Sequence, residues 1–333
     1  MHTIFFNNKP KIVATGTIAG PKESAGVVGR YVDKTLTDDM YGETTYEKAE
    51  CKMLSYAIAQ AIQNAGLTEQ DVDLLISGDL LNQIISASFA ARDFDFPFLG
   101  VYGACSTMAE SMAVGAAFVN AGYHKKVVAA TGSHFSSAER QYRYPLELGT
   151  TRPPQSQWTV TGAGGVLIAD MGASNGYPAI TAATFGRVVD YGITDVNNMG
   201  AAMAPACMDV LLNHLRDTGR KARDYDLIVT GDLGALGSRI LKDLTWEKGV
   251  DIQPNHVDCG EIIYNVIEDE FQGGSGAGCS AVVFNSYIMD KLKKGSFQRV
   301  LLCATGALLS TVSSGQGESI PCITHAVAIE RVE

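Results

Sequence analysis

Short apolar runs alternate with longer segments of helical spacing along most of the chain. The runs from Val72 to Ser77, Lys126 to Thr131 and Val300 to Thr305 are nearly continuous in apolar residues, which is typical of strands buried on both faces of a sheet. The segment from Tyr46 to Ala65 carries apolar residues at helical spacing and ends at a glycine. This alternation predicts an α/β protein whose sheets are covered by helices.

The same patterns predict further elements. Strands are expected at Phe98 to Tyr102, Gly165 to Asp170, Ala179 to Val188, Leu227 to Thr230 and Ile323 to Glu330. Helices are expected at Ser106 to Ala121, Met203 to Asp217 and Ala277 to Leu292. The helices rich in alanine and glycine can be buried on every side, so we expect them to lie between sheets.

A comparison of the chain with itself indicates a duplicated unit. The segment DLLISGDL at Asp73 aligns with DLIVTGDL at Asp226, with five of eight positions identical. The segment KVVAATG at Lys126 then matches VLLCATG at Val300, and a Cys-Ser dipeptide recurs at the same offset. We therefore predict a five-layered αβαβα arrangement of mixed, mainly parallel sheets, built from two duplicated halves at residues 1–177 and 178–333.

Charge and composition exclude several functions. The chain has 333 residues and a formal net charge of −10, and without a Lys/Arg run it is not expected to bind nucleic acid. Its most apolar stretch, Met108 to Tyr123, contains Glu110 and Asn120, which argues against a membrane span. The seven cysteines lack C-x-x-C spacing, so they predict a reducing, cytoplasmic compartment and no zinc site.

The strongest local signal for chemistry is the turn Gly103-Ala-Cys-Ser106. Cys105 comes just after a predicted strand and at the start of a predicted helix, where backbone N–H groups stabilise anions. Such a position can lower the pKa of a thiol and create a nucleophile. Alternatively, Cys105 is a small apolar filler, as buried cysteines usually are.

Two duplicated halves with this turn opening a central helix resemble the thiolase and ketoacyl-synthase superfamily. The resemblance implies that Cys105 stands where these enzymes hold an acyl group, and that the chain forms a homodimer by edge-to-edge sheet pairing. Condensation also needs histidine and asparagine donors that polarise the thioester. At the corresponding turns this chain has Gly231-Asp232 and Gly274, so we expect both donors to be missing.

A further set of motifs resembles one branch of the superfamily, the stage V sporulation protein AD family of spore-forming bacteria. These motifs are Gly78 to Gln83, Gly103 to Thr107, Ala138 to Pro145, Val160 to Gly164, Asp190 to Asp195, Gly200 to Pro205 and Glu318 to Cys322. The resemblance implies a protein that binds dipicolinic acid and acts in its uptake into the spore. It also implies membrane-embedded partner subunits and a cytoplasmic or forespore location, peripheral to the spore inner membrane.

Dipicolinate is a flat ring with two carboxylates, so its site needs charged donors, backbone N–H groups and a flat apolar wall. His134 follows a predicted core strand, where open α/β sheets place ligands, although it could also be a loop histidine without a role. Arg140 and Arg143 could capture carboxylates or form an exposed loop or dimer contact. The predicted ligand-binding residues are Cys105, His134, Arg140, Arg143, Asn82, Thr159, Thr161 and Asp232.

Other interpretations remain open at this point. Thr159 and Thr161 could serve strand packing, and Asp232 raises the possibility that calcium accompanies dipicolinate, although one carboxylate is a weak calcium signal. Cys105 would be a neutral thiol in a dianion site, because a thiolate would repel the ligand. The rival function is an active Cys105-dependent acyltransferase or condensing enzyme of the ketoacyl-synthase III type, and a third is a structural scaffold.

Overall fold

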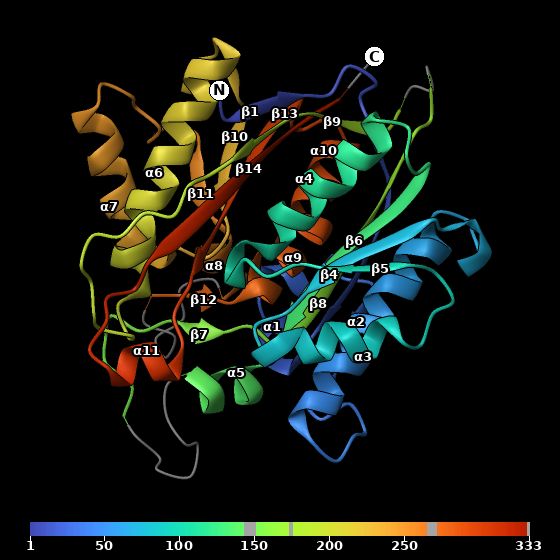
Figure 1. Cartoon of the computed structure of the whole chain (residues 1–333), viewed down its shortest axis with the longest axis horizontal. Helices are drawn as coiled ribbons and strands as arrows, with labels where there is room; N and C mark the ends of the chain where they lie inside the picture. The colour runs from blue at the N-terminus through green and yellow to red at the C-terminus, as the bar shows by residue number, and fades with distance from the viewer. Residues whose placement is uncertain (143–150, 173–175, 265–271, 332–333) are drawn as a thin grey trace.

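The computed structural model describes residues 1–142, 151–172, 176–264 and 272–331. Two sets of five strands form its centre, and together with two short strands they make one twelve-stranded sheet (Figure 1). The first set is β2 (Lys11–Ala19), β4 (Leu74–Gly78), β5 (Phe98–Gly100), β6 (Lys126–Ser133) and β8 (Gly162–Ala169). The second set is β9 (Pro178–Phe185), β10 (Leu227–Thr230), β11 (His256–Asp258), β13 (Arg299–Ala307) and β14 (Cys322–Arg331).

Both sets have the same strand order. The order across the sheet is β11-β10-β13-β14-β9 and then β2-β8-β6-β4-β5. If the strands of each set are numbered one to five along the chain, both sets run 3-2-4-5-1 from the edge of the sheet to its centre. The sets meet at their first strands, through the single pairing of Lys11 with Ala179. Each half is therefore one copy of the same unit, as the internal sequence matches predict, whereas the division at residues 177 and 178 stays a prediction.

A mixed α/β sheet is confirmed, but the expected predominance of parallel pairing is wrong. In each half the second strand pairs in parallel with its two neighbours. The fourth, fifth and first strands pair antiparallel, in longer registers. Strand β2 forms one of these antiparallel pairs, with β8. The apolar pattern does not predict this strand, because its sequence KIVATGTIA lacks a continuous run of large apolar residues.

Small elements complete the sheet. Strand β1 (Thr3–Phe5) pairs with β9, and β3 (Lys34–Thr35) pairs with β2. Strands β7 (Trp158–Thr159) and β12 (Gly274–Ser275) form a separate parallel pair, in which Thr159 lies opposite Ser275. This pair links the two halves directly beside the Cys105 turn.

Helices cover the sheet and fill the space between its halves. They are α1 (Pro21–Ser24), α2 (Tyr46–Asn64), α3 (Ile85–Ala91), α4 (Thr107–Asn120), α5 (Phe135–Tyr142), α6 (Met199–Thr218), α7 (Gly234–Glu247), α8 (Cys259–Ile263), α9 (Ala277–Val283), α10 (Met289–Lys293) and α11 (Thr311–Gly315). A π-helical turn, Phe284–Ile288, joins α9 to α10, where the sequence predicts one unbroken helix.

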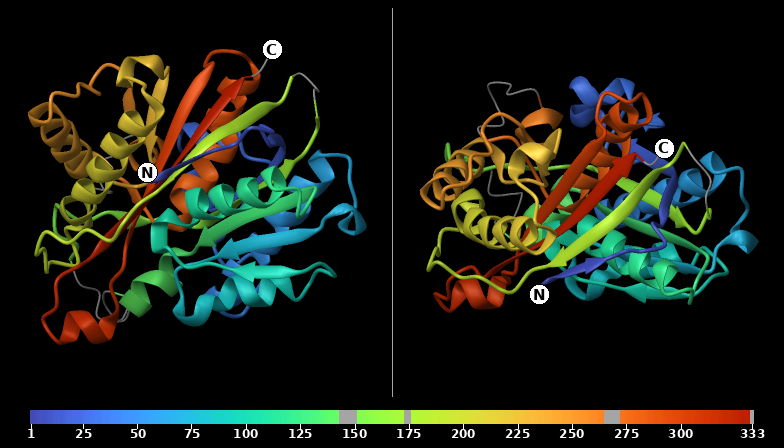
Figure 2. Two further views of the ribbon diagram at one scale, coloured as in Figure 1. Left: turned by 45° about the horizontal axis from the view of Figure 1, so that its top comes forward. Right: turned by 90° about the horizontal axis from the view of Figure 1, so that it is seen from above.

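Alternate strand residues pack into different cores. Leu75 contacts the core under α2, whereas Leu74 and Ile76 face the central core with Met108 of α4. In the second half, Leu301 faces the core under α6, and its two neighbours in β13 face the central core. Helix α4 contacts strands of both halves, so it lies between them, with α2 and α6 on the two outer faces (Figure 2).

Candidate functional site

The Cys105 turn lies between β5 and α4 in a strained backbone conformation. Ala104 has φ +50°, in the left-handed region that a residue with a Cβ adopts at a cost of roughly 1–3 kcal/mol. Thr107 Oγ1 donates to the Ala104 carbonyl at 2.6 Å, and Ser106 Oγ donates to the Gly103 carbonyl at 2.6 Å. A Cβ at Gly306 of β13 would lie 1.9 Å from the Gly103 carbonyl oxygen, so β13 presses directly on this turn.

Cys105 is buried and lines a small cavity, which we call the Cys105 cavity. Its volume is about 40 Å³, room for about three water molecules. The lining residues come from both halves: Leu80, Tyr102, Ala104, Cys105, Ala138, Glu139, Tyr142, Thr159, Met199, Ser275, Gly276, Ala307 and Leu309. The cavity thus lies at one end of the sheet, near α5, β7 and β12 (Figure 1).

Asp232 lies next to Cys105 in the turn after β10. Its carboxylate accepts from the Gly276 backbone N–H at 2.9 Å and from Ser275 Oγ at 3.3 Å, and it interacts with the Cys105 thiol. Burial raises the pKa of Asp232 to about 7, although the contacts with Gly276, Cys105 and Ser275 oppose this rise. Asp232 therefore exchanges its proton near neutral pH, within reach of the thiol.

Glu139 is the acidic side chain that lines the cavity itself. It accepts from Thr159 Oγ1 at 2.9 Å and forms an ion pair with Arg152 at 3.3 Å. The Arg152 guanidinium also lies over the rings of Phe135 and Trp158, which are stacked 3.9 Å apart. Arg152 thus brings a positive charge to the edge of the cavity, held against a flat aromatic surface.

The structure brings some of the predicted site residues together. Cys105 and Thr159 line the cavity, and Asp232 lies directly beside Cys105. Asn82 lines a neighbouring hollow instead, and its Oδ1 accepts from Gln141 Nε2 at 3.2 Å. Arg143 lies outside the described residues.

The other predicted residues do not line the cavity. His134 Nε2 bonds to the Asp39 carbonyl at 2.9 Å, and its Nδ1 accepts from the Ser136 backbone N–H at 3.1 Å. Arg140 is exposed and ion-paired with Glu47. Thr161 Oγ1 accepts from the Phe135 backbone N–H at 3.0 Å, and its own N–H donates to a buried glutamate of α1. These three residues connect α5 to neighbouring elements.

No histidine is among the residues that the structure places around the Cys105 cavity. His256 and His325 are buried elsewhere, and burial lowers their pKa to about 3 and about 4, so both are neutral. The glycine-rich turn contributes Ser275 as its polar side chain at the cavity. At Gly274 a Cβ would lie 2.7 Å from Ile263 Cγ2, so this position is closed to a larger side chain.

Several lining residues were not predicted as site residues. Glu139 and Tyr142 lie within the Ala138 to Pro145 motif, and Ser275 lies within the glycine-rich turn. These motifs therefore point to the right segments, although not to these residues. Tyr102 lies just before the Cys105 turn, but an aromatic residue at a strand end has no distinctive pattern. Met199 opens α6 and reaches the cavity only because the second half folds back onto the first.

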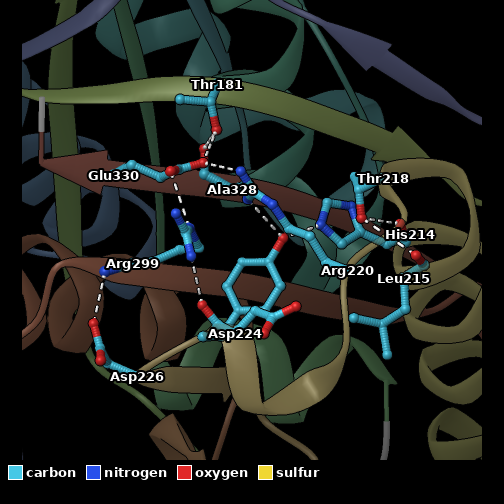
Figure 3. Close-up of polar contacts among 11 residues, drawn as sticks. Thr181, His214, Leu215, Thr218, Arg220, Asp224, Asp226, Arg299, Ala328 and Glu330 are labelled. Carbon is cyan, nitrogen blue, oxygen red and sulfur yellow. Dashed lines mark hydrogen bonds and ion pairs between the residues drawn. The ribbon is translucent and has the colours of Figure 1, made fainter.

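A second cluster of polar groups, drawn in Figure 3, gathers around the partly buried Glu330. Glu330 lies at the end of β14 away from Cys322, which pairs with the cavity-lining Ala307. Glu330 accepts from Thr181 Oγ1 at 2.6 Å and forms ion pairs with Arg220 at 2.8 Å and Arg299 at 3.0 Å. Burial would raise the pKa of Glu330, but these three contacts outweigh burial and lower it. The Tyr225 hydroxyl continues the cluster, with Arg220 at 3.1 Å and a buried histidine of α6 at 2.6 Å.

This Glu330 cluster fastens the ends of strands and helices. Arg299 and Glu330 are directly paired residues of β13 and β14, and Thr181 lies on the next strand, β9. Arg220 follows the C-terminus of α6, so the cluster also fixes that helix to the sheet. The polar groups of this cluster form hydrogen bonds and ion pairs with one another, which indicates a structural role.

Comparisons with known proteins identify relatives over nearly the whole chain. The family model described as stage V sporulation protein AD matches residues 1–330. The stage V sporulation protein AD of Bacillus subtilis (strain 168) is 46% identical over 330 residues, which cover 99% of this chain and 95% of that protein.

Solved structures of condensing enzymes have a similar fold. The tetronic acid condensing enzyme AbyA1 matches with a TM-score of 0.60 at 15% identity, over 96% of this chain and 99% of that one. The 3-oxoacyl-[acyl-carrier-protein] synthase III of Aquifex aeolicus VF5 matches with 0.54 at 15% identity, over the same shares. A variant of Xanthomonas campestris OleA matches with 0.61 at 13% identity, over 98% and 99%. The fold is thiolase-like, and the chain belongs to the stage V sporulation protein AD family.

Proposed function

We propose that this chain binds dipicolinic acid at the Cys105 cavity and serves the uptake of that acid into the developing spore, without condensing activity. Membership of a sporulation family and a thiolase-like fold support the proposal. The observation that carries it is the cavity itself, in which a thiol, a neighbouring acid and aromatic rings meet without a histidine.

The cavity has suitable chemistry for a flat aromatic acid. Tyr102 and Tyr142 offer ring surfaces, and Ser275 and Thr159 offer hydroxyl groups. Asp232, with a pKa of about 7, can be protonated when a carboxylate arrives, which removes the repulsion between two anions. Because the cavity holds only about three waters, the ligand needs its wall to open.

The same residues argue against condensation. Condensation would need hydrogen-bond donors positioned at the thioester carbonyl, whose hydrogen bonds become stronger as negative charge develops on the oxygen. Asp232 and Gly274 occupy the two turns from which histidine and asparagine donors are expected. Neither position supplies the imidazole or amide donor that would stabilise an enolate oxygen.

Calcium has no protein site of its own in this proposal. The described residues contain no group of three or more His, Cys, Asp or Glu side chains that could hold a metal ion. Calcium prefers six to eight oxygen ligands, which one aspartate cannot supply. Calcium would therefore enter only as the counter-ion of the ligand.

We also propose a homodimer and membrane-embedded partner subunits, with this chain peripheral to the spore inner membrane. Strand β5 is an edge strand, and the exposed apolar side chains Ile85, Phe89 and Leu99 lie on or next to it, which suits sheet pairing with a second copy. Among the described helices, none is long and apolar enough to cross a bilayer, so transport of a solute needs other subunits.

Calorimetric titration of dipicolinate, with and without calcium, tests the proposal. We expect saturable binding to the wild type. Ala138→Leu places a larger side chain into the cavity and should weaken binding at least tenfold, about 1.4 kcal/mol. The double variant His134→Ala/Arg140→Ala should bind like the wild type, because both side chains lie outside the cavity lining.

Loss of binding in that double variant alone would place the ligand at α5 instead. No heat at millimolar dipicolinate would overturn the proposal. Incubation with an acyl-CoA, followed by mass measurement of the Cys105 peptide, tests the acyltransferase alternative, and a stoichiometric acyl adduct would favour it over ligand binding.

A further inference from the structure

An open groove lies at the C-terminal end of α6, between this helix and the segment that follows α7. We call it the basic groove; its volume is about 830 Å³. Of the described residues that line it, Arg216, Arg220, Lys221 and Arg223 are cations, and Asp251 is the one acid. The net charge of the whole chain is −10, so the groove is a positive site on an acidic molecule.

Lys221 and Arg223 carry positive charge that the fold itself does not use. Both residues are exposed, and within the described parts of the chain no ion pair involves either side chain. Their acidic neighbours are engaged by backbone groups: Asp224 accepts from the Lys221 N–H at 2.8 Å, and Asp217 accepts from the His2 N–H at 2.8 Å. Both cations are therefore available to an anionic partner.

The rest of the lining is apolar and firmly held. Leu212, Leu215 and Val250 line the groove and pack against the core of the second half under α6. Arg220 is fixed at the groove by its ion pair with Glu330 at 2.8 Å (Figure 3). A firm apolar surface beside exposed cations suits a partner that carries both apolar side chains and carboxylates.

The basic groove is remote from the Cys105 cavity and from the proposed dimer face. It contains Arg220, the partner of Glu330, which lies at the end of β14 away from the cavity. It also contains Pro254, which comes just before β11, and β11 and β5 are the two opposite ends of the strand order. A second copy paired at β5 would therefore leave the groove free.

Two features favour a protein segment as the partner. Strand β11 is an edge strand, and among the described strands only β10 pairs with it, so its other edge can accept an extended chain. Trp246 is 63% exposed and accepts from the Gly249 N–H, whose residue lines the groove. Tryptophan and arginine are enriched among the residues that dominate protein interfaces.

An anionic bilayer fits this surface less well. A bilayer meets a broad area of a protein, and the acids of this chain outnumber its Lys and Arg residues by 36 to 26. Two free cations in a groove can pair with individual carboxylates, but they do not offset the repulsion of the surrounding acids from a charged plane.

From these observations we infer that the basic groove docks an acidic, extended segment of a partner protein. Its carboxylates pair with Lys221 and Arg223, its apolar side chains contact Leu212 and Val250, and its backbone continues to the free edge of β11. That the partner is a membrane-embedded subunit rests on the proposed function. The groove and its preference for an acidic segment do not.

Fluorescence anisotropy of a labelled synthetic peptide of alternating glutamate and valine residues tests the inference on the full chain. We expect saturable binding at about 0.15 M salt, and roughly tenfold weaker binding to Lys221→Glu/Arg223→Glu. The control Lys125→Glu/Lys293→Glu makes the same change of net charge at exposed residues outside the groove, and it should bind the peptide like the wild type.

Equal affinities of the two double variants would overturn the inference, because binding would then follow net charge alone. No binding to the wild type would also overturn it. Sedimentation with phosphatidylglycerol vesicles that the groove variant loses, without peptide binding, would overturn it in favour of a lipid surface. If charge reversal unfolds the chain, seen as lost circular dichroism, Lys221→Gln/Arg223→Gln decides by the same comparison.

Titration of dipicolinate separates this inference from the proposed function. The variant Lys221→Glu/Arg223→Glu should bind dipicolinate like the wild type, because the groove and the Cys105 cavity share no lining residue. Peptide binding at the groove without dipicolinate binding to the wild type would support the docking surface and overturn only the ligand assignment.

Discussion

Glu330, which is partly buried, and Asp232, which is fully buried, are carboxylic acids at opposite ends of the second half. Glu330 has two arginines and a threonine as partners, and its pKa is lowered. Asp232 has backbone, hydroxyl and thiol partners without a cation, and burial raises its pKa to about 7. Neighbouring cations stabilise the ionised form of a buried acid. Without cations the acid keeps its proton up to a higher pH, so it can exchange that proton near neutral pH.

The same contrast holds for a second acid near the cavity. Glu50 of α2 is fully buried, and its pKa is raised well above the ordinary value, first by burial and then by the neighbouring charge of Asp79. Asp79 has a pKa of about 6, raised by burial against three backbone hydrogen bonds. Near the cavity, burial thus raises the pKa of Asp232, Asp79 and Glu50, whereas at the other end the arginines lower the pKa of Glu330.

The largest effect should come from neutralising the paired acid. Glu330→Gln leaves Arg220 and Arg299 without their counter-charge, and both are partly withdrawn from water. We expect the free energy of unfolding to fall by about 2–3 kcal/mol at pH 7, less than for a fully buried pair because the arginines are partly exposed. Urea unfolding measures this as a lower midpoint at constant slope.

The matched control for that variant is Glu318→Gln, which changes the same group at an exposed position. Its midpoint should stay within experimental error of the wild type. Equal midpoints for the two variants would contradict the view that Glu330 is held ionised by its arginines.

An intermediate effect is expected from Asp232, and it should depend on pH. Because its folded pKa of about 7 lies above the ordinary value of 3.8, the native state keeps a proton that the unfolded chain releases. This group therefore favours folding at low pH, and that contribution is lost as pH rises from about 4 to 7. Asp232→Asn should remove this loss, gaining about 2 kcal/mol relative to the wild type between pH 5 and pH 8.

Unfolding midpoints of both proteins at pH 5, 6, 7 and 8 measure that difference. A difference that does not change with pH would mean that Asp232 is ionised throughout this range. In that case the proposed site would hold a fixed negative charge beside Cys105, which argues against binding of a dianion.

The sequence could predict much of this arrangement, but unevenly. The duplicated strand-turn segments at Asp73 and Asp226 revealed two like halves, because buried strands and their tight turns tolerate few residues. The sequence does not predict the antiparallel pairs, because an apolar run shows that a strand is buried but not the direction of its neighbours. It does not predict strand β2 either, because that strand has no such run.

For the candidate site, local motifs predict the Cys105 turn but not most of the other residues that line the Cys105 cavity. The turns that carry Cys105 and Asp232 predict both as site residues; the structure places them in contact, and their role stays a prediction. The place of His134 at a strand end predicts a site residue, and this stays a prediction. Its ring bonds to the Asp39 carbonyl and the Ser136 backbone N–H, contacts that depend on tertiary packing and that no local pattern encodes. Met199 and Tyr102 reach the cavity through tertiary contacts, which no local pattern encodes.

The smallest effect should come from Glu50→Gln, the same substitution as at Glu330. Because Glu50 is held protonated by burial and by Asp79, glutamine replaces a neutral group with a neutral group of similar shape. Ser137 Oγ donates to the carboxyl group and can donate equally to the amide oxygen. We expect a loss below about 1 kcal/mol at pH 6, measured by urea unfolding beside Glu330→Gln. A loss as large as that at Glu330 would mean that Glu50 is ionised, and the two ends of the molecule would then differ only in their partners.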